Sequence, residues 1–283
     1  MRSRRRRFES FAGTVVVVTG AGSGIGRATA RRFAGLGARL HLADIDAEAL
    51  VRVREEIVAA GGTAQDHVVD SSDPTAVEGL AERVFATDGA VDVLHNNAGV
   101  GHAASTEHTT VEDWQRVIGV NLLGVAYGVQ AFAPRMLRQG RGAAIVNTAS
   151  GLGLIPAASM APYTASKFGV VGMTEALNAE LSPCGIHLSA ICPGIIDTEI
   201  TGTATMGGEM AASQDAAVAF YRRYGASPDA VAESVVEAVR KRKLIQPVPT
   251  SHVVPGWLVH RLSARAFQPL ARGLVKLIAR GGR

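Results

Sequence analysis

The residues with the clearest chemical potential lie between positions 150 and 167. Tyr163 and Lys167 are four positions apart, so their side chains would share one face of a helix. A phenol has a pKa of about 10, and a nearby ammonium group stabilises the phenolate and lowers that value. Ser150 lies in the preceding segment, where its hydroxyl could hydrogen-bond a carbonyl oxygen at the same place. These three side chains predict a proton-transfer site for an alcohol and ketone pair.

Lys167 differs from the other basic residues around it. It is the only lysine before Lys241, and arginine occupies every other basic position in between. Arginine cannot replace lysine where a compact ammonium on a four-carbon chain is needed. We therefore favour a functional pair over the alternative that the Tyr-x-x-x-Lys spacing arises by chance.

A glycine-rich turn lies near the start of the chain. A β-branched run at 14–19 is followed by Gly20-x-x-x-Gly24-x-Gly26 and by a predicted helix at 25–36. Strand, turn and helix in this order direct backbone N–H groups and a positive helix end at a phosphate. The spacing differs from the standard G-x-G-x-x-G, so the turn alone is weak evidence for a dinucleotide.

Asp44, at the end of the second predicted strand, adds to the evidence from the turn. A carboxylate in this place accepts hydrogen bonds from ribose hydroxyls and disfavours a 2′-phosphate. Ile45 follows it, and Ser23 occupies the turn position where a basic residue could meet a phosphate. The pattern favours NAD over NADP, with Arg27 and Arg39 as the nearest contrary features. The alternative is an acid in a solvated turn.

The elements that must position these residues alternate between short apolar runs and helices. Strands are predicted at 14–19, 38–44, 65–70, 91–96, 143–148, 186–192 and 244–248. The alternation predicts one α/β domain of parallel βαβ units with right-handed crossovers. The uncharged segment 117–134 is interpreted as a buried helix, because it is barely long enough to span a membrane and contains Asn121, Gln130 and three glycines.

With these residues identified, the chain resembles the short-chain dehydrogenase/reductase family over about residues 13–250. Five motifs occur in the family's order, and its glycine spacing explains the non-standard turn. They are Thr19 to Gly26, Asn96-Asn-Ala-Gly99, Asn121, Ser150 with Tyr163-x-x-x-Lys167, and Pro193-Gly194 followed by Thr198.

The resemblance implies a single-domain Rossmann fold with a doubly wound, seven-stranded parallel sheet. It also implies a homodimer or homotetramer built on the helices that contain Asn121 and Tyr163. Tyr163 would be the acid and base, and Ser150 would hold the substrate oxygen. Lys167 would hold the nicotinamide ribose and, with the cationic ring, lower the pKa of Tyr163. Asn121 would bind a water that connects Lys167 to solvent.

The resemblance also implies a set of NAD-binding residues, in which Asp70 would meet the adenine amino group. The set is Gly20, Ser23, Gly24, Ile25, Gly26, Asp44, Asp70, Ser71, Asn97, Ala98, Gly99, Tyr163, Lys167, Pro193, Gly194, Ile196 and Thr198. No metal site is expected, because the histidines are scattered and His102 and His108 have no companion ligands nearby in the sequence.

Substrate contacts are expected from the segment after the serine and from a mobile flap at about residues 198–226. The predicted substrate residues are Ser150, Leu152, Tyr163 and Met206. Further candidates are Leu154, Ile155, Met160, Met210, Phe220, Tyr221 and Tyr224. These mostly apolar side chains favour a hydrophobic secondary alcohol or ketone, such as a steroid, a terpenoid or a lipid-like molecule. The alternative is that they only pack the flap.

Two rival functions remain open at this point. One is an NADP-dependent carbonyl or 3-oxoacyl reductase. The other is a non-catalytic binding protein that senses the cofactor, which is disfavoured because the tyrosine and the lysine are both present.

The positive net charge of +4 comes from the two ends of the chain. Residues 9–239 contain 14 Lys and Arg against 25 Asp and Glu, whereas residues 240–283 contain ten basic residues and no acid. This distribution argues against a nucleic-acid-binding body. Residues 1–12, with five arginines, are interpreted as a loosely held basic arm.

An arginine run without a following apolar region does not predict a signal peptide. Two cysteines indicate no disulfide framework, so we expect a cytoplasmic protein.

Residues 251–283 form a basic extension beyond the family pattern. A helix is predicted with Pro269 in its first turn, after a separate segment at 257–267. Its basic face would hold Arg272, Lys276 and Arg280, and its apolar face Leu270, Leu274, Leu277 and Ile278. Such a helix can lie peripherally on an anionic membrane or cover an apolar groove on its own subunit or a partner. The acidic body favours packing on protein.

Overall fold

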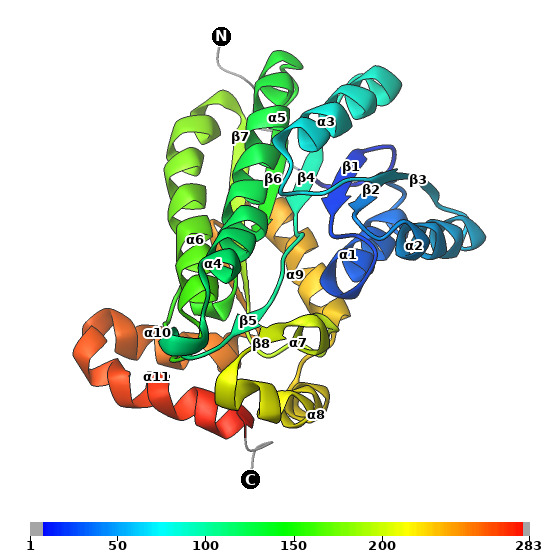
Figure 1. Ribbon diagram of the computed structural model, residues 1–283. Helices are drawn as coiled ribbons and strands as arrows, with labels where there is room; N and C mark the ends of the chain where they lie inside the picture. The colour runs from blue at the N-terminus through cyan, green and yellow to red at the C-terminus, as the bar shows by residue number, and fades with distance from the viewer. Residues whose placement is uncertain (1–7, 280–283) are drawn as a thin grey trace.

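A parallel sheet of seven strands runs through the centre of the computed structural model, which describes residues 8–279 (Figure 1). Its order is β3 (Thr63–Val68), β2 (Arg39–Asp44), β1 (Val15–Thr19), β4 (Val93–Asn96), β6 (Ala143–Thr148), β7 (Ile186–Pro193) and β9 (Ile245–Val248). The strand order reverses between β1 and β4, and ligands bind at the carboxyl ends of strands at such a point. The predicted doubly wound, seven-stranded sheet is confirmed.

Helices cover both faces of the sheet because its central strands are apolar on both sides. On one face, Val16 and Val18 pack with α1 (Gly24–Ala34), α2 (Ala47–Ala59) and α9 (Pro228–Lys241). On the other face, Val15 and Val17 share a core with α3 (Pro74–Asp88), α5 (Gly124–Arg138) and the end of α6 (Ala161–Leu181). Successive side chains of a strand point to opposite faces, so one valine run serves both cores.

The uncharged segment lies inside a longer helical stretch. Helix α4 (Val111–Ile118) continues through a π-helical turn, Gly119–Leu123, into α5. The stretch Val111–Arg138 is long and apolar enough to cross a membrane, but half of its most apolar window is buried in the protein. Because Phe132 and Met136 belong to the core against the sheet, the buried-helix interpretation fits the structure.

Two sequence expectations near the amino terminus need correction. The third strand begins at Thr63 and ends at Val68, so Asp70 lies two residues beyond it. The loosely held arm does not extend to residue 12, because Phe8 and Phe11 are buried in the core. The Phe11 ring meets the Phe33 ring edge-on at 5.0 Å between centroids, which anchors this segment to α1. Residues 1–7 lie outside the described part of the chain.

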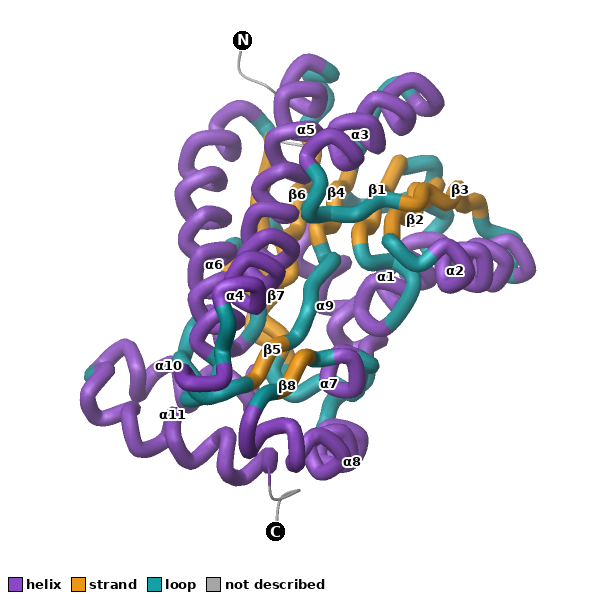
Figure 2. Tube along the Cα trace, viewed as in Figure 1, coloured by secondary structure: helices purple, strands orange, loops and turns teal. Residues whose placement is uncertain are grey.

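The flap contains regular elements that the sequence did not predict. Helix α7 (Ile200–Thr203) is followed by β8 (Thr205–Met206) and by α8 (Gln214–Tyr224). Strand β8 pairs in parallel with β5 (His102–Ala103), which follows β4. Figure 2 shows this small pair between the carboxyl ends of the main strands and the helices below them.

The carboxyl-terminal extension forms two helices, α10 (Thr250–Leu262) and α11 (Ala264–Ala279), at the same end of the molecule as the flap (Figure 1). The prediction that Pro269 opens the second helix is wrong. The Ser263 hydroxyl accepts a hydrogen bond from the Ala266 backbone at 3.1 Å, and a serine in this role begins a helix. Phe267 and Ala271 are the buried residues, whereas Leu270 is half exposed. The predicted side-chain positions at 274–280 lie outside the described side chains.

Candidate active site

A cavity of about 640 Å³ opens at the carboxyl ends of β1, β2, β4, β6 and β7 and runs toward the flap. It brings together residues predicted from widely separated motifs. Every predicted cofactor residue lines it except Gly26, and so do Ser150, Leu152 and Met206. Asn121 is buried outside the cavity wall. These predicted residues, other than Gly26 and Asn121, therefore line one cavity.

The glycine turn requires glycine for two different reasons. Gly20 and Gly24 have φ angles of 63° and 49°, in the left-handed region that other residues rarely adopt. A Cβ on Gly26 would instead overlap the Gly20 carbonyl oxygen, so this glycine allows α1 to pack against the turn. Ser23 precedes α1 without capping it through its side chain, which leaves the first backbone N–H groups of the helix free to bind an anion.

Asp44 is fixed beside this turn. Its Oδ2 accepts a hydrogen bond from the Gly22 backbone at 2.8 Å, and its Oδ1 accepts one from Asp46 at 3.1 Å. Ile45, next to it, is 68% exposed and also lines the cavity. An acid beside an exposed apolar side chain suits the ribose and the adenine of a dinucleotide.

The motif after β4 connects the turn to the rest of the site. The Asn97 side chain donates to the carbonyl oxygens of Thr19 at 3.1 Å and Gly20 at 3.2 Å. The Thr19 hydroxyl accepts hydrogen bonds from the backbones of Asn97 and Ala98 at 2.9 and 3.1 Å. These bonds hold β1 and β4 together where the strand order reverses. The residues present therefore fit a nicotinamide dinucleotide.

Lys167 is a buried residue of the cavity lining. It is 3% exposed, and its Nζ donates to the Thr148 carbonyl oxygen at 3.0 Å. Burial lowers its pKa to about 8. The Nζ atom lies 5.6 Å from the centre of the Tyr163 ring, so the two side chains share one helix face as the spacing predicts.

Tyr163 does not have the lowered pKa that was expected from Lys167. Burial raises its pKa above the usual phenol value, and a hydrogen bond with Ser150 offsets part of that rise. The Ser150 oxygen also accepts a hydrogen bond from the Leu152 backbone at 3.1 Å. The lysine is itself desolvated and bound to Thr148, which explains why it does not dominate the electrostatics of the phenol.

Asn121 lies in the π-helical turn and is fully buried. Its Oδ1 accepts a hydrogen bond from the Val100 backbone N–H at 2.8 Å, and its Nδ2 donates to the Val100 carbonyl oxygen at 2.9 Å. The side chain thus fixes the segment after Gly99. Turns of π-helix inside α-helices often mark functional sites.

The substrate end of the cavity is lined by most of the predicted side chains. These include Leu152, Ile155, Met160, Met206, Met210 and Tyr221. Three predicted candidates do not line it: Leu154 and Phe220 pack inside the protein, and Tyr224 is 43% exposed.

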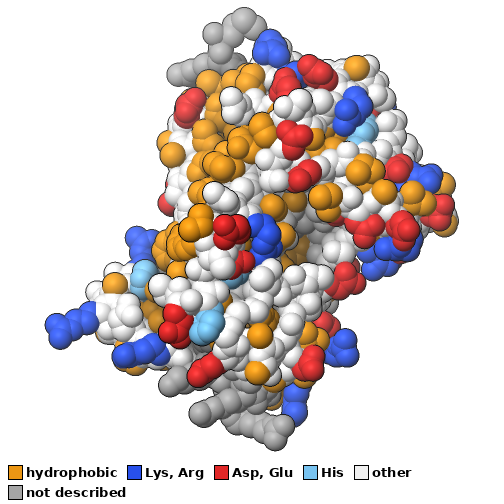
Figure 3. All heavy atoms as spheres, in the orientation of Figure 1, with side chains coloured by type: hydrophobic (Ala, Val, Ile, Leu, Met, Phe, Trp, Pro, Cys, Tyr) orange, Lys and Arg blue, Asp and Glu red, His pale blue; other side chains and the backbone are white. Residues whose placement is uncertain are grey.

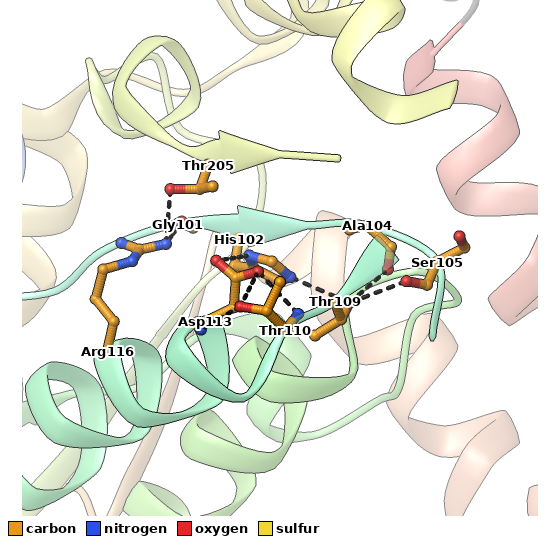
Figure 4. Close-up of polar contacts among 9 residues, drawn as sticks. All are labelled: Gly101, His102, Ala104, Ser105, Thr109, Thr110, Asp113, Arg116 and Thr205. Atoms are coloured by element: carbon orange, nitrogen blue, oxygen red, sulfur yellow. Dashed lines mark hydrogen bonds and ion pairs between the residues drawn. The ribbon is translucent and has the colours of Figure 1, made fainter. Parts of the chain in front are cut away.

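A polar cluster from α4 holds the flap against the segment after β4 (Figure 4). Arg116 donates to the Thr205 hydroxyl at 2.8 Å and reaches the Gly101 carbonyl oxygen at 3.4 Å. His102, buried beside it, lies 3.5 Å from the Asp113 carboxylate. This contact is not apparent from the sequence because Asp113 lies on the next helix, α4.

The carboxyl-terminal extension supplies cavity residues that sequence reasoning missed. His252 and Val253, from α10, line the cavity next to Gly194. Farther along, Phe267 packs with Ile155, and the Ala271 carbonyl oxygen accepts a hydrogen bond from the Ala158 backbone at 3.3 Å. No sequence motif predicts these contacts. The extension therefore covers the substrate end of its own subunit.

The family model described as short chain dehydrogenase matches residues 14–207. The chain belongs to the short-chain dehydrogenase/reductase family.

Curated relatives support the same assignment. The probable oxidoreductase EphD of Mycobacterium tuberculosis is 41% identical over 274 residues, which cover 93% of this chain and 45% of that protein. The chain thus spans about half the length of that relative. A cyclohexanol dehydrogenase of Acinetobacter is 41% identical over 191 residues, covering 67% of this chain and 76% of that protein.

Solved structures of this family differ in their cofactor. A short-chain dehydrogenase/reductase from Burkholderia phymatum in complex with NAD is 35% identical, with a TM-score of 0.85 over 93% of this chain and 96% of that chain. A metagenomic short-chain oxidoreductase in complex with NADP is 34% identical, with a TM-score of 0.70 over 85% and 97% of the two chains.

Proposed function

We propose that this oxidoreductase interconverts hydrophobic secondary alcohols and ketones with NAD(H). One observation carries the proposal: Ser150, Tyr163 and Lys167 line the same cavity as the glycine turn and Asp44. A proton-transfer group and a dinucleotide cradle in one cavity are what alcohol oxidation requires.

In the oxidation direction, Tyr163 accepts the hydroxyl proton of the substrate while Ser150 holds the oxygen by a hydrogen bond. Bound NAD supplies the hydride acceptor. Lys167 holds the ribose next to the nicotinamide, and its ammonium stabilises the phenolate form of Tyr163 in the ternary complex. Asn121 positions the backbone after Gly99 and, with a bound water, connects Lys167 to solvent.

Two features support NAD over NADP. The Asp44 carboxylate faces the glycine turn, where it would repel a 2′-phosphate. Arg27, the nearest basic side chain on α1, is paired with Glu56 at 2.8 Å, which turns it toward α2. The alternative is an NADP-dependent carbonyl or 3-oxoacyl reductase, since structures of this family occur with either cofactor.

The apolar lining supports a hydrophobic substrate of the steroid, terpenoid or lipid-derived class. Among the relatives are a cyclohexanol dehydrogenase and a 3beta-hydroxysteroid dehydrogenase 2 of Eggerthella lenta, the latter 36% identical over 199 residues. A D-threitol dehydrogenase of Mycolicibacterium smegmatis, 37% identical over 188 residues, is the counterexample, because its named substrate is polar.

The proposal is tested by titrating NADH and NADPH fluorescence and by assaying apolar secondary alcohols at 340 nm. Wild type should bind NADH more tightly than NADPH. Asp44→Ala should lower the affinity for NADH by about tenfold or more and raise the affinity for NADPH. The control is Asp46→Ala, which removes from the same loop a carboxylate that caps α2. This variant should keep the preference for NADH over NADPH. Tighter NADPH binding by wild type would overturn the NAD assignment. Binding of NADH without turnover of any alcohol would favour a cofactor-sensing protein.

We further infer a cytoplasmic homodimer or homotetramer. Apolar side chains gather over α4 and α5 on the face seen in Figure 3. Trp114, Leu123 and Leu137 are each 38–41% exposed there, and Phe168 of α6 is 37% exposed. Leu123→Glu should shift the mass measured by light scattering to that of a monomer.

A peripheral membrane contact through α11 is the alternative role of the extension, and co-sedimentation with anionic vesicles would reveal it.

A further inference from the structure

Tyr221 is a polar residue in the otherwise mostly apolar substrate end, and the proton path does not use it. It lies on α8 of the flap and lines the cavity together with Met206 and Met210. Its neighbour Phe220 is 5% exposed and anchors α8 in the protein. The helix therefore presents one phenol to the cavity from a fixed position.

The Tyr221 hydroxyl has no hydrogen-bond partner among the described residues. It also differs from the hydroxyls of Thr164 and Ser189, which are fully enclosed by protein without a partner. The Tyr221 oxygen is thus accessible, on a residue that lines the cavity. A purely hydrocarbon substrate would displace water from this oxygen and leave it unpaired, which is unfavourable.

The state of the phenol suits a hydrogen-bond donor. Burial and, to a smaller extent, the negative charge of an ionised Tyr163 raise the pKa of Tyr221 to about 12. Tyr221 is therefore neutral at working pH, and it is close enough to Tyr163 to sense its charge. A substrate with two oxygens would meet a proton acceptor, Tyr163, at the reacting oxygen and a donor, Tyr221, at the second.

Two other polar side chains at this end are engaged. Arg116 is bound to Thr205 and Gly101, and His102 contacts Asp113 and Thr109. His252 lies on the opposite side, against Gly194. Tyr221 thus offers a second substrate oxygen a hydroxyl that has no partner among the described residues.

We propose that Tyr221 donates a hydrogen bond to a second oxygen of the substrate. The preferred substrates are then apolar secondary alcohols, or the matching ketones, that carry a nearby carbonyl, hydroxyl or ether oxygen. This inference rests on the proposed function. It narrows the substrate class from hydrophobic alcohols in general to those with a second acceptor.

The test compares cyclohexanol with 2-, 3- and 4-methoxycyclohexanol, in which an ether oxygen accepts but cannot donate. For wild type, kcat/KM of the best methoxy compound should exceed that of cyclohexanol by about tenfold, mainly through KM. In Tyr221→Phe this ratio should fall to near one. Tyr224→Phe removes a hydroxyl from the same helix outside the cavity and should keep the wild-type ratio.

Three outcomes would contradict the inference. Tyr221→Phe could reduce kcat/KM for all four alcohols by the same factor, which would indicate packing alone. Wild type could turn over cyclohexanol and the ethers equally, which would leave the proposed function intact and remove only the role of Tyr221. Wild type could turn over none of them with NAD or NADP, which would overturn both proposals.

Discussion

The two ends of the cavity are built by different means. At the cofactor end, close contacts between backbone atoms fix the geometry. Gly26 lies against the Gly20 carbonyl oxygen, and Thr19 and Asn97 bond to backbone atoms. At the substrate end, side chains from the segment after Ser150, from the flap and from α10 form the wall. Backbone atoms thus define the cofactor end, and packed side chains define the substrate end.

This difference separates what each end tolerates. A backbone cradle accepts only the residue that fits, so a single added methyl group should disturb cofactor binding. A side-chain wall can change in volume or polarity and still close, so substitutions there should change which alcohol binds. Tyr163 and Lys167 lie where the two ends meet, and their substitution should have the largest effects.

Tyr163→Phe should give the largest change. It removes the proton acceptor but keeps the ring, so kcat should fall by about 10²- to 10⁴-fold, while the affinity for NADH changes little. Steady-state assays at 340 nm and NADH fluorescence measure the two quantities. Turnover near the wild-type level would show that the proton leaves by another route.

Lys167 allows a pH-dependent test of the same junction. Burial lowers its pKa from 10.5 to about 8, so below pH 8 both states carry the proton and the folded state bears the full desolvation cost. Between pH 8 and 10.5 the unfolded state binds more protons, so wild-type stability gains from this group as pH rises. The cost at neutral pH is about 3 kcal/mol.

Lys167→Met should therefore raise the free energy of unfolding at pH 7 by up to that amount, and the gain should disappear as pH approaches 10.5. Urea unfolding at several pH values measures it. Lys241→Met, at a surface lysine paired with Glu237, is the control and should change stability by less than about 1 kcal/mol at every pH. A gain independent of pH would mean that packing, rather than the charge, is responsible.

Gly26→Ala tests the backbone cradle directly. The new Cβ would overlap the Gly20 carbonyl oxygen, so the turn must shift, at a cost of about 1–3 kcal/mol. NADH affinity should fall by about tenfold or more. Gly172→Ala is the matched control, because it is a helical glycine of α6 whose Cβ would meet nothing within 4 Å. That variant should bind NADH normally and be slightly more stable.

The same contrast explains which features could be predicted from sequence. The cofactor end was readable because backbone geometry demands particular residues at fixed spacing, as at Gly20, Gly24 and Gly26. Most strands were readable from apolar runs bounded by turns, whereas β3 is mostly polar and was predicted two residues too late. Lys167 was readable because it is the only lysine before Lys241.

The substrate end was less readable because its contacts join distant segments. The pairing of β5 with β8 links residue 102 to residue 205 through two-residue strands with no pattern of their own. His252 reaches the cavity only because α10 follows β9 back over Gly194. Pro269 was misplaced because a serine cap six residues earlier, together with the burial of Phe267, outweighs one missing backbone hydrogen bond.

Phe267→Ala should have the smallest of these effects and the most selective one. Phe267 is 2% exposed and packs with Ile155, which lines the substrate end. Its loss should raise KM for a large apolar alcohol by about fivefold, because the wall loses support, and leave NADH affinity unchanged. Leu270→Ala, on the same helix but 51% exposed, should change neither quantity. If Phe267→Ala weakened NADH as strongly as it raised KM, the two ends of the cavity would be coupled through the flap.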